Sequence, residues 1–459
     1  MAFCPNCGTQ INPGFSFCPN CGFKVASFAG ASTPAKLPEQ VDFIDNYLRI
    51  DPSSQTYDSF IKKTVIKGDV ISICSAMDSE IIPAIQSGDA SAKVVLGVLY
   101  EKGFAVEKNL DKAFRCFMDS AEKGNPVAQW IAGLMNMEAD SSLVLFWDLD
   151  LVRGYRWFSK SAAQGYCAAM VNLGNCYSSG KGVAQNKSEA LNWYRKAADS
   201  GFAPAQNKLG RCYCGWENGF KRDYSEALKW FSKAAAQQYA PSQNNLGVCF
   251  SYGLGVPKDE AEAVKWYRKA AEQGYSIAQN NLGQDYTDGI GVAENKSEAE
   301  KWFRKAAEQG YAAAQSNLGR CYEFGWGVPV DIQKAFEWYQ KAADQGDING
   351  QYHLGRYYEG LRINGHRTEV DKSRRDLSQA AKWFRLAAEQ GSSQAQYKAG
   401  RYCSDNAEAV MWMKKAIEQG NADAMSEMGI WYKYGERGLP ENRVKAEELW
   451  QKANEIRGH

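Results

Sequence analysis

The chain has 459 residues, and its 54 Lys and Arg against 53 Asp and Glu give a formal net charge of +1. A dedicated nucleic-acid-binding protein normally shows a basic excess, which this chain lacks. The apolar fraction of 44% disfavours an acidic disordered chain. With only three His, catalysis by histidine or a multi-histidine metal site has little material to work with.

The composition also bears on the compartment. No stretch approaches the roughly 18 to 20 consecutive apolar residues that a membrane-spanning helix needs. The N-terminal sequence MAFCPNCG has neither the basic nor the apolar region of a secretory signal. We therefore expect a cytoplasmic protein without a membrane span, whose 13 cysteines stay reduced and serve as metal ligands or small core residues.

The first 24 residues contain the pentapeptide Cys-Pro-Asn-Cys-Gly twice. Two residues between cysteines let both sulfurs of a tight turn face one ion, and two such turns supply the four thiolates of a tetrahedral structural Zn²⁺ site. The intervening segment is long enough for a short hairpin. Iron also binds four thiolates and is the alternative metal, whereas two disulfides would require an oxidising compartment. The predicted ligands of one structural zinc ion are Cys4, Cys7, Cys18 and Cys21.

This N-terminal segment resembles the zinc-ribbon family, with rubredoxin-like knuckles over about residues 3–23. All four thiolates are used, so the resemblance implies a structural site with no position left for water or substrate. Many zinc ribbons contact nucleic acid, but Lys24 is the single charged side chain within residues 1–30. A phosphate-binding surface is therefore missing from the ribbon, and we expect no nucleic-acid partner.

Two further segments follow the predicted ribbon of residues 1–24. Residues 25–40 are small, polar and interrupted by two prolines, which predicts a flexible linker. Residues 41–87 regain apolar spacing and predict a helical lead segment.

Residues 88–459 contain one unit repeated about ten times. The repeat is marked by a glycine that follows Leu, Ala or Met, and a fixed period of 20 to 50 residues is typical of a solenoid. Most of the intervals are 36 residues, with one of 45 and one of 29 near the end. The marker glycines are at positions 97, 133, 174, 210, 247, 283, 319, 355, 400 and 429.

Residues 275–310 show how one unit predicts two helices. Ala278, Leu282 and Tyr286 are spaced four apart, which places an apolar stripe on one helix. A Gly-Ile-Gly turn follows, and then Asn295 with Glu298 three residues on predicts the capping box of a second helix. A tryptophan stands seven residues after each such cap. Nine of the 14 Trp share this phase, at positions 157, 193, 230, 266, 302, 338, 383, 412 and 450.

These units resemble the Sel-one-like repeat family, relatives of tetratricopeptide repeats, over about residues 88–458. The fold that this implies is all-α: a right-handed α/α superhelical solenoid, preceded by the ribbon and the linker. The family pattern has departures. The second unit carries an insertion around residues 141–150 and the eighth around residues 362–375, while the ninth has a shortened loop. Insertions in solenoids fall in loops, often on the binding face.

A ladder of polar side chains is expected on the concave face of the solenoid. In several first helices the residue before Leu (or Ala) and the residue three further on are Asn, Gln, His, Lys or Arg, and this spacing puts both on one helix face. Asn can bind an extended peptide backbone and Arg its carboxylates, although a merely solvated face is the alternative. The ladder residues are Lys208, Arg211, Asn281, Gln284, Asn317, Arg320, His353, Arg356, Lys398 and Arg401.

The remaining patterns do not predict catalysis. Cys176, Cys212, Cys249 and Cys321 share one phase without a regular partner cysteine, so we interpret them as small interior residues. Some secreted relatives are discussed as penicillin-binding proteins, and S-x-x-K matches begin at Ser59 and at Ser178, the latter expected in an inter-helix turn. Residues 404–406 match S-D-N, but no K-T-G is present.

The sequence therefore favours a non-enzymatic scaffold that binds a protein or peptide partner. An enzyme or enzyme regulator of β-lactamase-like hydrolase type, acting on peptides or cell-wall fragments, is the alternative.

Overall fold

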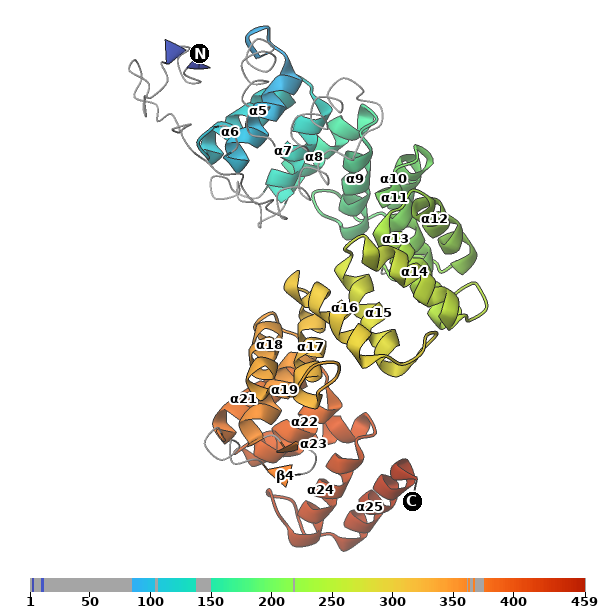
Figure 1. Ribbon diagram of the computed structural model, residues 1–459, viewed down its shortest axis with the longest axis vertical. Coiled ribbons are helices and arrows are strands. Elements are labelled where there is room, and N and C mark those ends of the chain that lie inside the picture. Colours follow the sequence, from blue (N-terminus) through green and yellow to red (C-terminus); the bar gives the residue numbers. More distant parts are fainter. Residues whose placement is uncertain are drawn as a thin grey trace. The chain divides into compact units, whose positions relative to one another are not determined.

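The computed structural model describes residues 2–3, 10–11, 85–103, 106–137, 150–217, 219–360, 362–363, 366–367 and 375–458. These residues form twenty helices and four two-residue strands (Figure 1). They belong to two compact units, residues 1–237 and residues 238–459. The predicted linker and almost all of the helical lead segment lie outside the described residues.

Each helix packs most extensively against one neighbour in sequence, which gives ten consecutive helix pairs. The first unit contains α5 (Ala90–Lys102), α6 (Leu110–Glu122), α7 (Pro126–Met137), α8 (Leu151–Ala163), α9 (Cys167–Ser179), α10 (Lys187–Asp199), α11 (Ala203–Cys214) and α12 (Tyr224–Ala236). The second contains α13 (Ala240–Tyr252), α14 (Glu260–Glu272), α15 (Ser276–Asp288), α16 (Lys296–Glu308), α17 (Ala312–Phe324), α18 (Ile332–Asp344), α19 (Ile348–Gly360), α21 (Leu377–Glu389), α22 (Ser393–Tyr402), α23 (Asn406–Glu418), α24 (Ala422–Tyr434) and α25 (Arg443–Arg457). The predicted all-α repeat architecture is confirmed.

The second helix of a pair begins at the predicted cap. Asn295 has extended backbone angles, and its side chain accepts a hydrogen bond from the backbone N–H of Glu298 at 3.0 Å. The reciprocal half of the predicted capping box is replaced. The backbone N–H of Asn295 donates instead to the carbonyl of Tyr286 at 2.8 Å, and the Glu298 carboxylate pairs with Lys301 at 2.6 Å. The cap therefore also ties the second helix to the first.

An aromatic ring of the second helix lies against the marker glycine in most repeats. A Cβ built on Gly283 would lie 2.7 Å from the ring of Phe303, closer than atoms in contact can approach. Each of these rings directly follows the tryptophan of the second helix and is almost fully buried. Rings packed on a marker glycine in this way are Phe158, Tyr194, Phe231, Tyr267, Phe303, Tyr339 and Phe384.

In several repeats, the tight turn between the two helices of a pair packs on the preceding pair. Gly291 has φ +65°, and a Cβ there would lie 2.2 Å from the carbonyl oxygen of Glu260, at the start of α14. Val292, the next residue, packs against the core cluster that contains Leu282 and Tyr267. The turn thus covers the beginning of the previous second helix.

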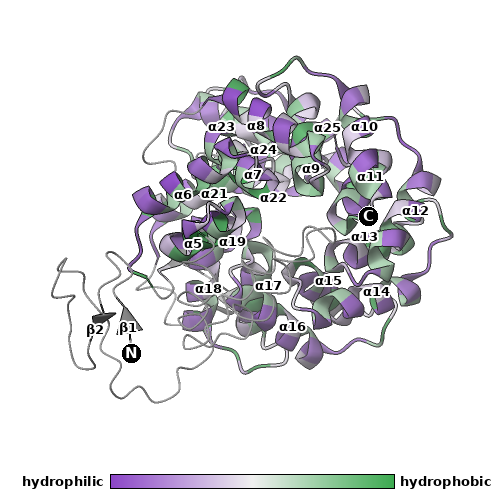
Figure 2. Cartoon of the chain, turned by 90° about the horizontal axis from the view of Figure 1, so that it is seen from above, coloured by the Kyte–Doolittle hydropathy of each residue, from purple (hydrophilic) through white to green (hydrophobic). Residues whose placement is uncertain are grey.

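The tryptophans lie on the second helices, as predicted, and a lysine ammonium lies over most of their rings. In α16 the ammonium of Lys305 lies 4.0 Å from the ring centroid of Trp302, a cation–π contact one helical turn along. Equivalent contacts at 4.0 to 4.6 Å involve Trp157, Trp193, Trp230, Trp266, Trp338 and Trp412. In Figure 2, hydrophilic residues mark the sides of α14 and α16 that face away from their paired helices.

The four short strands lie outside the helix pairs. β1 (Ala2–Phe3) pairs antiparallel with β2 (Gln10–Ile11), on either side of the first cysteine pentapeptide in sequence. β3 (Arg362–Ile363) pairs with β4 (His366–Arg367) within the insertion of the eighth unit, between α19 and α21 as expected for a loop insertion. Among the described helices, none combines the length and apolar character needed to cross a bilayer.

Candidate functional site

The predicted zinc ligands Cys4, Cys7, Cys18 and Cys21 lie outside the described residues, as does most of the segment expected to form a hairpin between them, of which only Gln10 and Ile11 are described. The donor set itself, four thiolates in two C-x2-C pairs, fits a tetrahedral metal ion. Across the part of the chain that the structure describes, no group of three or more His, Cys, Asp or Glu side chains could hold a metal.

In the compact unit of residues 1–237, both predicted ladder residues form ion pairs with one carboxylate of their own repeat. The ammonium of Lys208 and the guanidinium of Arg211 each lie 3.1 Å from the same oxygen of Glu217, just beyond the end of α11. The Arg211 side chain remains about half exposed, so its outer face is accessible.

In the second compact unit, two ladder asparagines bind asparagine side chains of the preceding repeat that are not part of the ladder. The side-chain amide of Asn281 in α15 donates to the side chain of Asn244 in α13 at 3.0 Å. Asn317 in α17 donates to Asn280 in α15 at 2.9 Å. Gln284 donates to Asp288 within its own helix at 2.6 Å.

His353 and Arg356 of α19 converge on one buried carboxylate. Nδ1 of His353 lies 3.2 Å from Glu323 Oε2, and an Nη of Arg356 lies 3.1 Å from Glu323 Oε1. Tyr339 donates its hydroxyl to Glu323 at 2.6 Å and stacks on the His353 ring at 4.6 Å. Burial acts to raise the pKa of Glu323, but the His353 hydrogen bond and the Arg356 charge outweigh it and hold that pKa below its usual value. Burial lowers the pKa of His353.

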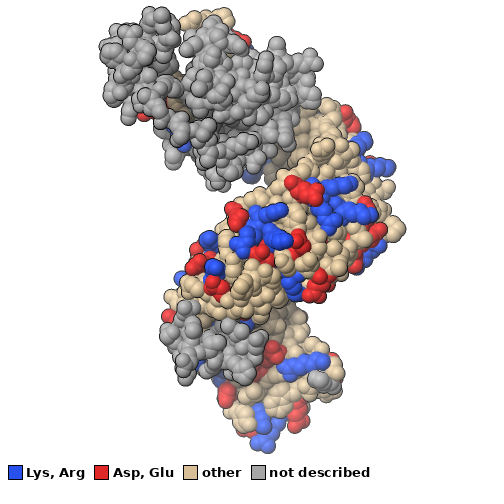
Figure 3. All heavy atoms as spheres, viewed as in Figure 1, with Lys and Arg blue, Asp and Glu red and all other residues tan. Residues whose placement is uncertain are grey.

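The last ladder residues also have partners within the chain. Lys398 of α22 lies 2.8 Å from a Glu359 oxygen on α19. Arg320 lies over the ring of Trp326, with its central carbon 4.8 Å from the ring centroid, and Arg401 donates to the hydroxyl of Tyr397 at 3.4 Å. The ladder is thus largely a set of internal contacts, several of which join neighbouring repeats. Figure 3 shows acidic and basic side chains intermixed on the visible face over α13–α16.

The serine motifs have structural contacts where they are described. Ser178 lies in the last turn of α9, so its expected place in an inter-helix turn is wrong. Its hydroxyl accepts from Lys187 at 3.1 Å, not from the lysine of the motif. Asp405 caps α23 by accepting from the backbone N–H of Glu408 at 2.7 Å. Ser59 lies outside the described residues.

The interior thiols behave as predicted from their shared phase. Cys176, Cys212, Cys249 and Cys321 are all buried. Burial raises the pKa of Cys176 to about 11 and those of Cys212 and Cys321 to about 12. These three thiols stay protonated at neutral pH and are poor nucleophiles.

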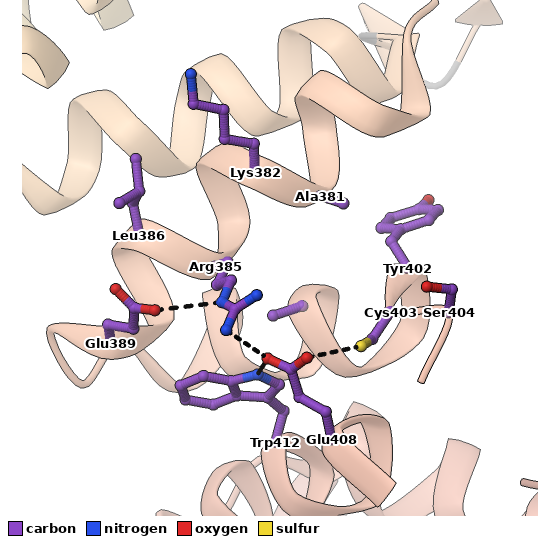
Figure 4. Close-up of a pocket in the computed structure, with 11 residues that line it drawn as sticks. Ala381, Lys382, Arg385, Leu386, Glu389, Tyr402, Cys403, Ser404, Glu408 and Trp412 are labelled. Atoms are coloured by element: carbon purple, nitrogen blue, oxygen red, sulfur yellow. Dashed lines mark hydrogen bonds and ion pairs between the residues drawn. The ribbon is translucent and has the colours of Figure 1, made fainter. Parts of the chain in front are cut away.

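A pocket of about 430 Å³ opens between α21, α22 and α23 (Figure 4). Arg385 crosses it, donating from Nε to Glu389 at 3.3 Å and pairing through Nη2 with Glu408 at 3.2 Å. The indole N–H of Trp412 and the thiol of Cys403 also donate to Glu408, at 3.2 and 3.4 Å. The lining residues are Ala381, Lys382, Arg385, Leu386, Glu389, Ala399, Tyr402, Cys403, Ser404, Glu408 and Trp412.

The sequence contained a signal for this pocket. The marker glycines of the ninth and tenth units are 29 residues apart instead of 36, so seven residues of the usual turn region are missing there. α22 has 10 residues where most first helices have 13, and Ser404 and Asp405 lead directly into α23. The shortened loop was visible in the sequence, but its effect on packing was not.

Consecutive helix pairs, joined by glycine turns and packed through one aromatic position, define an α/α repeat protein. The Sel1 repeat model matches ten segments: residues 90–125, 147–166, 167–202, 203–239, 240–275, 276–311, 312–347, 348–392, 393–421 and 422–455. The chain therefore belongs to the Sel1 repeat family. A zinc-ribbon domain model matches residues 3–25.

Solved structures and curated proteins are similar to parts of this chain. A protective antigen present in uropathogenic Escherichia coli strains, with an SLR fold, is 34% identical; the match covers 82% of this chain and 79% of that one, with a TM-score of 0.56. A Sel1 repeat protein from Oxalobacter formigenes is 31% identical, covering 70% of this chain and 90% of that one, with a TM-score of 0.47.

Among curated proteins, the DAP3-binding cell death enhancer 1 of Rattus norvegicus is 40% identical over 57 residues, 12% of this chain. Its Mus musculus counterpart is 37% identical over the same length. The chain spans 11% of the length of these curated relatives.

Proposed function

We propose that the chain is a non-enzymatic scaffold whose repeat array binds a protein or peptide partner. Sel1 repeat proteins typically serve as protein-interaction scaffolds, and this chain has the same succession of helix pairs. The observation that carries the proposal is the open pocket at the ninth repeat. It combines apolar walls with a few polar groups, as ligand sites do, in an array whose regular turns are closed by their own side chains.

Only some residues of the predicted concave-face ladder are part of the proposed binding surface. Arg356 and Lys398 neutralise carboxylates of the fold, and His353 contacts one of them, so binding a partner would have to break those contacts. Arg320 differs because it lies over an aromatic ring, and Arg211, although it pairs with Glu217, keeps about half of its side chain exposed. We propose that these two residues contribute most of what the ladder offers a partner.

We also propose that Cys4, Cys7, Cys18 and Cys21 hold one structural metal ion, zinc in preference to iron. The match to a zinc-ribbon domain supports this. When bound, zinc would supply folding free energy and no open coordination position. The four thiolates would fix the two knuckles around it. A cytoplasmic location accompanies the proposal, because free thiols persist in a reducing compartment.

The hydrolase alternative finds little support in these contacts. The S-D-N aspartate caps a helix, and Ser178 pairs with a lysine outside its motif. A serine hydrolase needs its base positioned on the nucleophile and oriented by a third group. An activity-based β-lactam probe that labelled Ser59, Ser178 or Ser404 in the full-length protein would revive this alternative.

Site-specific photo-crosslinking in the native host tests the scaffold proposal. A photoreactive amino acid replaces Leu386 in the pocket wall, Arg211 on the ladder, or Glu447 on an exposed part of α25 as the matched control. We expect one discrete protein adduct from Leu386 or Arg211 that Glu447 does not give. If no position gave an adduct above the level of a protein-free vector control, the scaffold proposal would be wrong.

A further inference from the structure

The third residue after the marker glycine is aromatic in most repeats. In three repeats it is a tyrosine whose hydroxyl accepts a hydrogen bond from an arginine of the preceding repeat, two residues after the tryptophan there. The distances are 2.6 Å for Arg195 to Tyr213 and 2.9 Å for both Arg268 to Tyr286 and Arg304 to Tyr322. The aromatic residues at this position are Tyr100, Tyr177, Tyr213, Phe250, Tyr286, Tyr322, Tyr358 and Tyr432.

Before the ninth repeat, the arginine is present but the tyrosine is not: the eighth repeat has Arg385, while the ninth lacks the tyrosine. Arg385 stands two residues after Trp383, while the position three after Gly400 is Cys403. The same repeat lacks the Gly-x-Gly-Val turn, whose valines Val292 and Val328 pack into the cores of two other repeats of this unit. The ninth repeat therefore lacks both the aromatic side chain and the turn valine. Arg385 instead binds Glu389 and Glu408.

Tyr402, one residue earlier, does not take the missing place. Its ring stacks on Phe384 with centroids 6.0 Å apart, and its hydroxyl donates to Glu359 of α19. In Figure 4 its ring lies at one end of the pocket, away from the Arg385 guanidinium. The space beside Arg385, Cys403 and Trp412 stays open as the pocket.

We propose that this pocket binds a tyrosine side chain of the partner protein, which takes the position of the tyrosine that the ninth repeat lacks. This inference rests on the proposed function, because it presumes a protein partner. The phenol ring would lie against Ala399 and Leu386, and its hydroxyl would accept from Arg385, as the internal tyrosines accept from Arg268 and Arg304. Glu408 pairs with the same guanidinium and can accept a hydrogen bond from the tyrosine hydroxyl.

The cavity has room for more than a phenol ring. Its volume of about 430 Å³ falls within the range of about 300 to 1,000 Å³ that ligand pockets span. A tyrosine together with part of its flanking backbone would fit. Because the hydroxyl gains a hydrogen bond to a charged group, we expect phenylalanine to bind about tenfold more weakly than tyrosine.

The test uses N-acetyltyrosinamide and N-acetylphenylalaninamide as probes of the full-length protein, with binding followed by saturation-transfer NMR. We expect a Kd of about 1 mM for the tyrosine probe, given the size of the ligand. The substitution Cys403→Tyr restores the internal side chain and should weaken this binding at least about tenfold. Circular dichroism and Tm establish that this variant is folded.

A second pair of variants keeps the test decisive if Cys403→Tyr fails to fold. Arg385→Gln, at an exposed residue, should remove the preference for tyrosine over phenylalanine. Its matched control, Arg268→Gln, alters the equivalent arginine of a regular repeat and should leave probe binding unchanged. Absence of saturable binding, or equal binding to wild type, Cys403→Tyr and Arg385→Gln, would overturn the inference.

The outcomes separate this inference from the scaffold proposal. A partner crosslinked from Leu386 equally well in wild type and Cys403→Tyr would leave the scaffold standing and overturn the tyrosine site. Tyrosine binding at the pocket without any crosslinked partner would support the site and contradict the scaffold.

Discussion

Asp285 gives a stability prediction whose magnitude depends on pH. It stands two residues after Gly283, where the flanking repeats carry the buried Cys249 and Cys321. Its Oδ2 is buried and has no hydrogen-bond partner among the described residues. Burial, with smaller contributions from Asp288 and Glu260, raises the pKa of Asp285 to about 7. The fold therefore holds a carboxylate where its neighbours hold a thiol.

The magnitude follows from linkage. An unfolded aspartate has a pKa of about 3.9, so the native state binds more protons than the unfolded state between about pH 4 and pH 7. Stability therefore falls as the pH rises through this window, and the loss is complete above pH 7. A shift of about three units corresponds to at most about 4 kcal/mol, and partial exposure of the side chain reduces this to about 1–3 kcal/mol.

The substitution Asp285→Asn removes the charge and keeps the shape. We expect it to raise the free energy of unfolding by about 1–3 kcal/mol at pH 8 and to have almost no effect at pH 4. Urea unfolding followed by circular dichroism measures the change. Hydrogen exchange in α15 and α16 gives a local readout, since repeat arrays unfold in partly independent blocks.

The control for this experiment is Glu272→Gln, which removes an exposed carboxylate from α14. It should change stability by less than about 0.5 kcal/mol at either pH. A gain for Asp285→Asn that was equal at pH 4 and pH 8 would show that ionisation is not the cause. A loss at pH 8 would show that the carboxylate is stabilised by partners, which refutes the reasoning.

Three further predictions concern the ribbon and the core. Full-length protein should carry one zinc ion per chain by elemental analysis, and Cys4→Ser combined with Cys21→Ser should abolish it; wild-type protein purified metal-free without chelator would contradict the site. Gly319→Ala should destabilise by about 1–3 kcal/mol in urea unfolding, because the added Cβ would lie 2.6 Å from the Tyr339 ring. Glu323→Gln should destabilise by about 3–5 kcal/mol, since Arg356 loses its buried counter-charge, and an unchanged Tm would disprove that pairing.

The helix pairs could be predicted from the sequence because their signals are local. The cap at Asn295 and the tryptophan at Trp302 belong to one helix, and both lie where their spacing predicted. The reciprocal capping bond was not predicted correctly, because the carbonyl of Tyr286 on the paired helix takes the N–H. That competition depends on tertiary packing, which the spacing within one helix does not contain.

The ladder shows why site residues are harder to predict than helices. His353 and Arg356 share a helix face, and their spacing looks like that of solvated side chains. Their acid, Glu323, is four residues after the marker glycine of the previous repeat, and Glu359 has the same place relative to Lys398. The complementarity therefore runs between repeats, about one period apart. A comparison of equivalent positions in neighbouring units would have found it.

These inter-repeat contacts also bear on how the pocket could bind. Lys398 and the Tyr402 hydroxyl both engage Glu359, which ties α22 to α19. The stacking of Tyr402 on Phe384 ties α22 to α21, and Arg385 joins α21 to Glu408 of α23. The walls of the pocket are thus held from three sides before any ligand arrives. A partner side chain would enter a site that needs little ordering, and less of its interaction free energy would be lost to conformational entropy. Loss of Glu359 should therefore weaken probe binding at the pocket, although Glu359 does not line it.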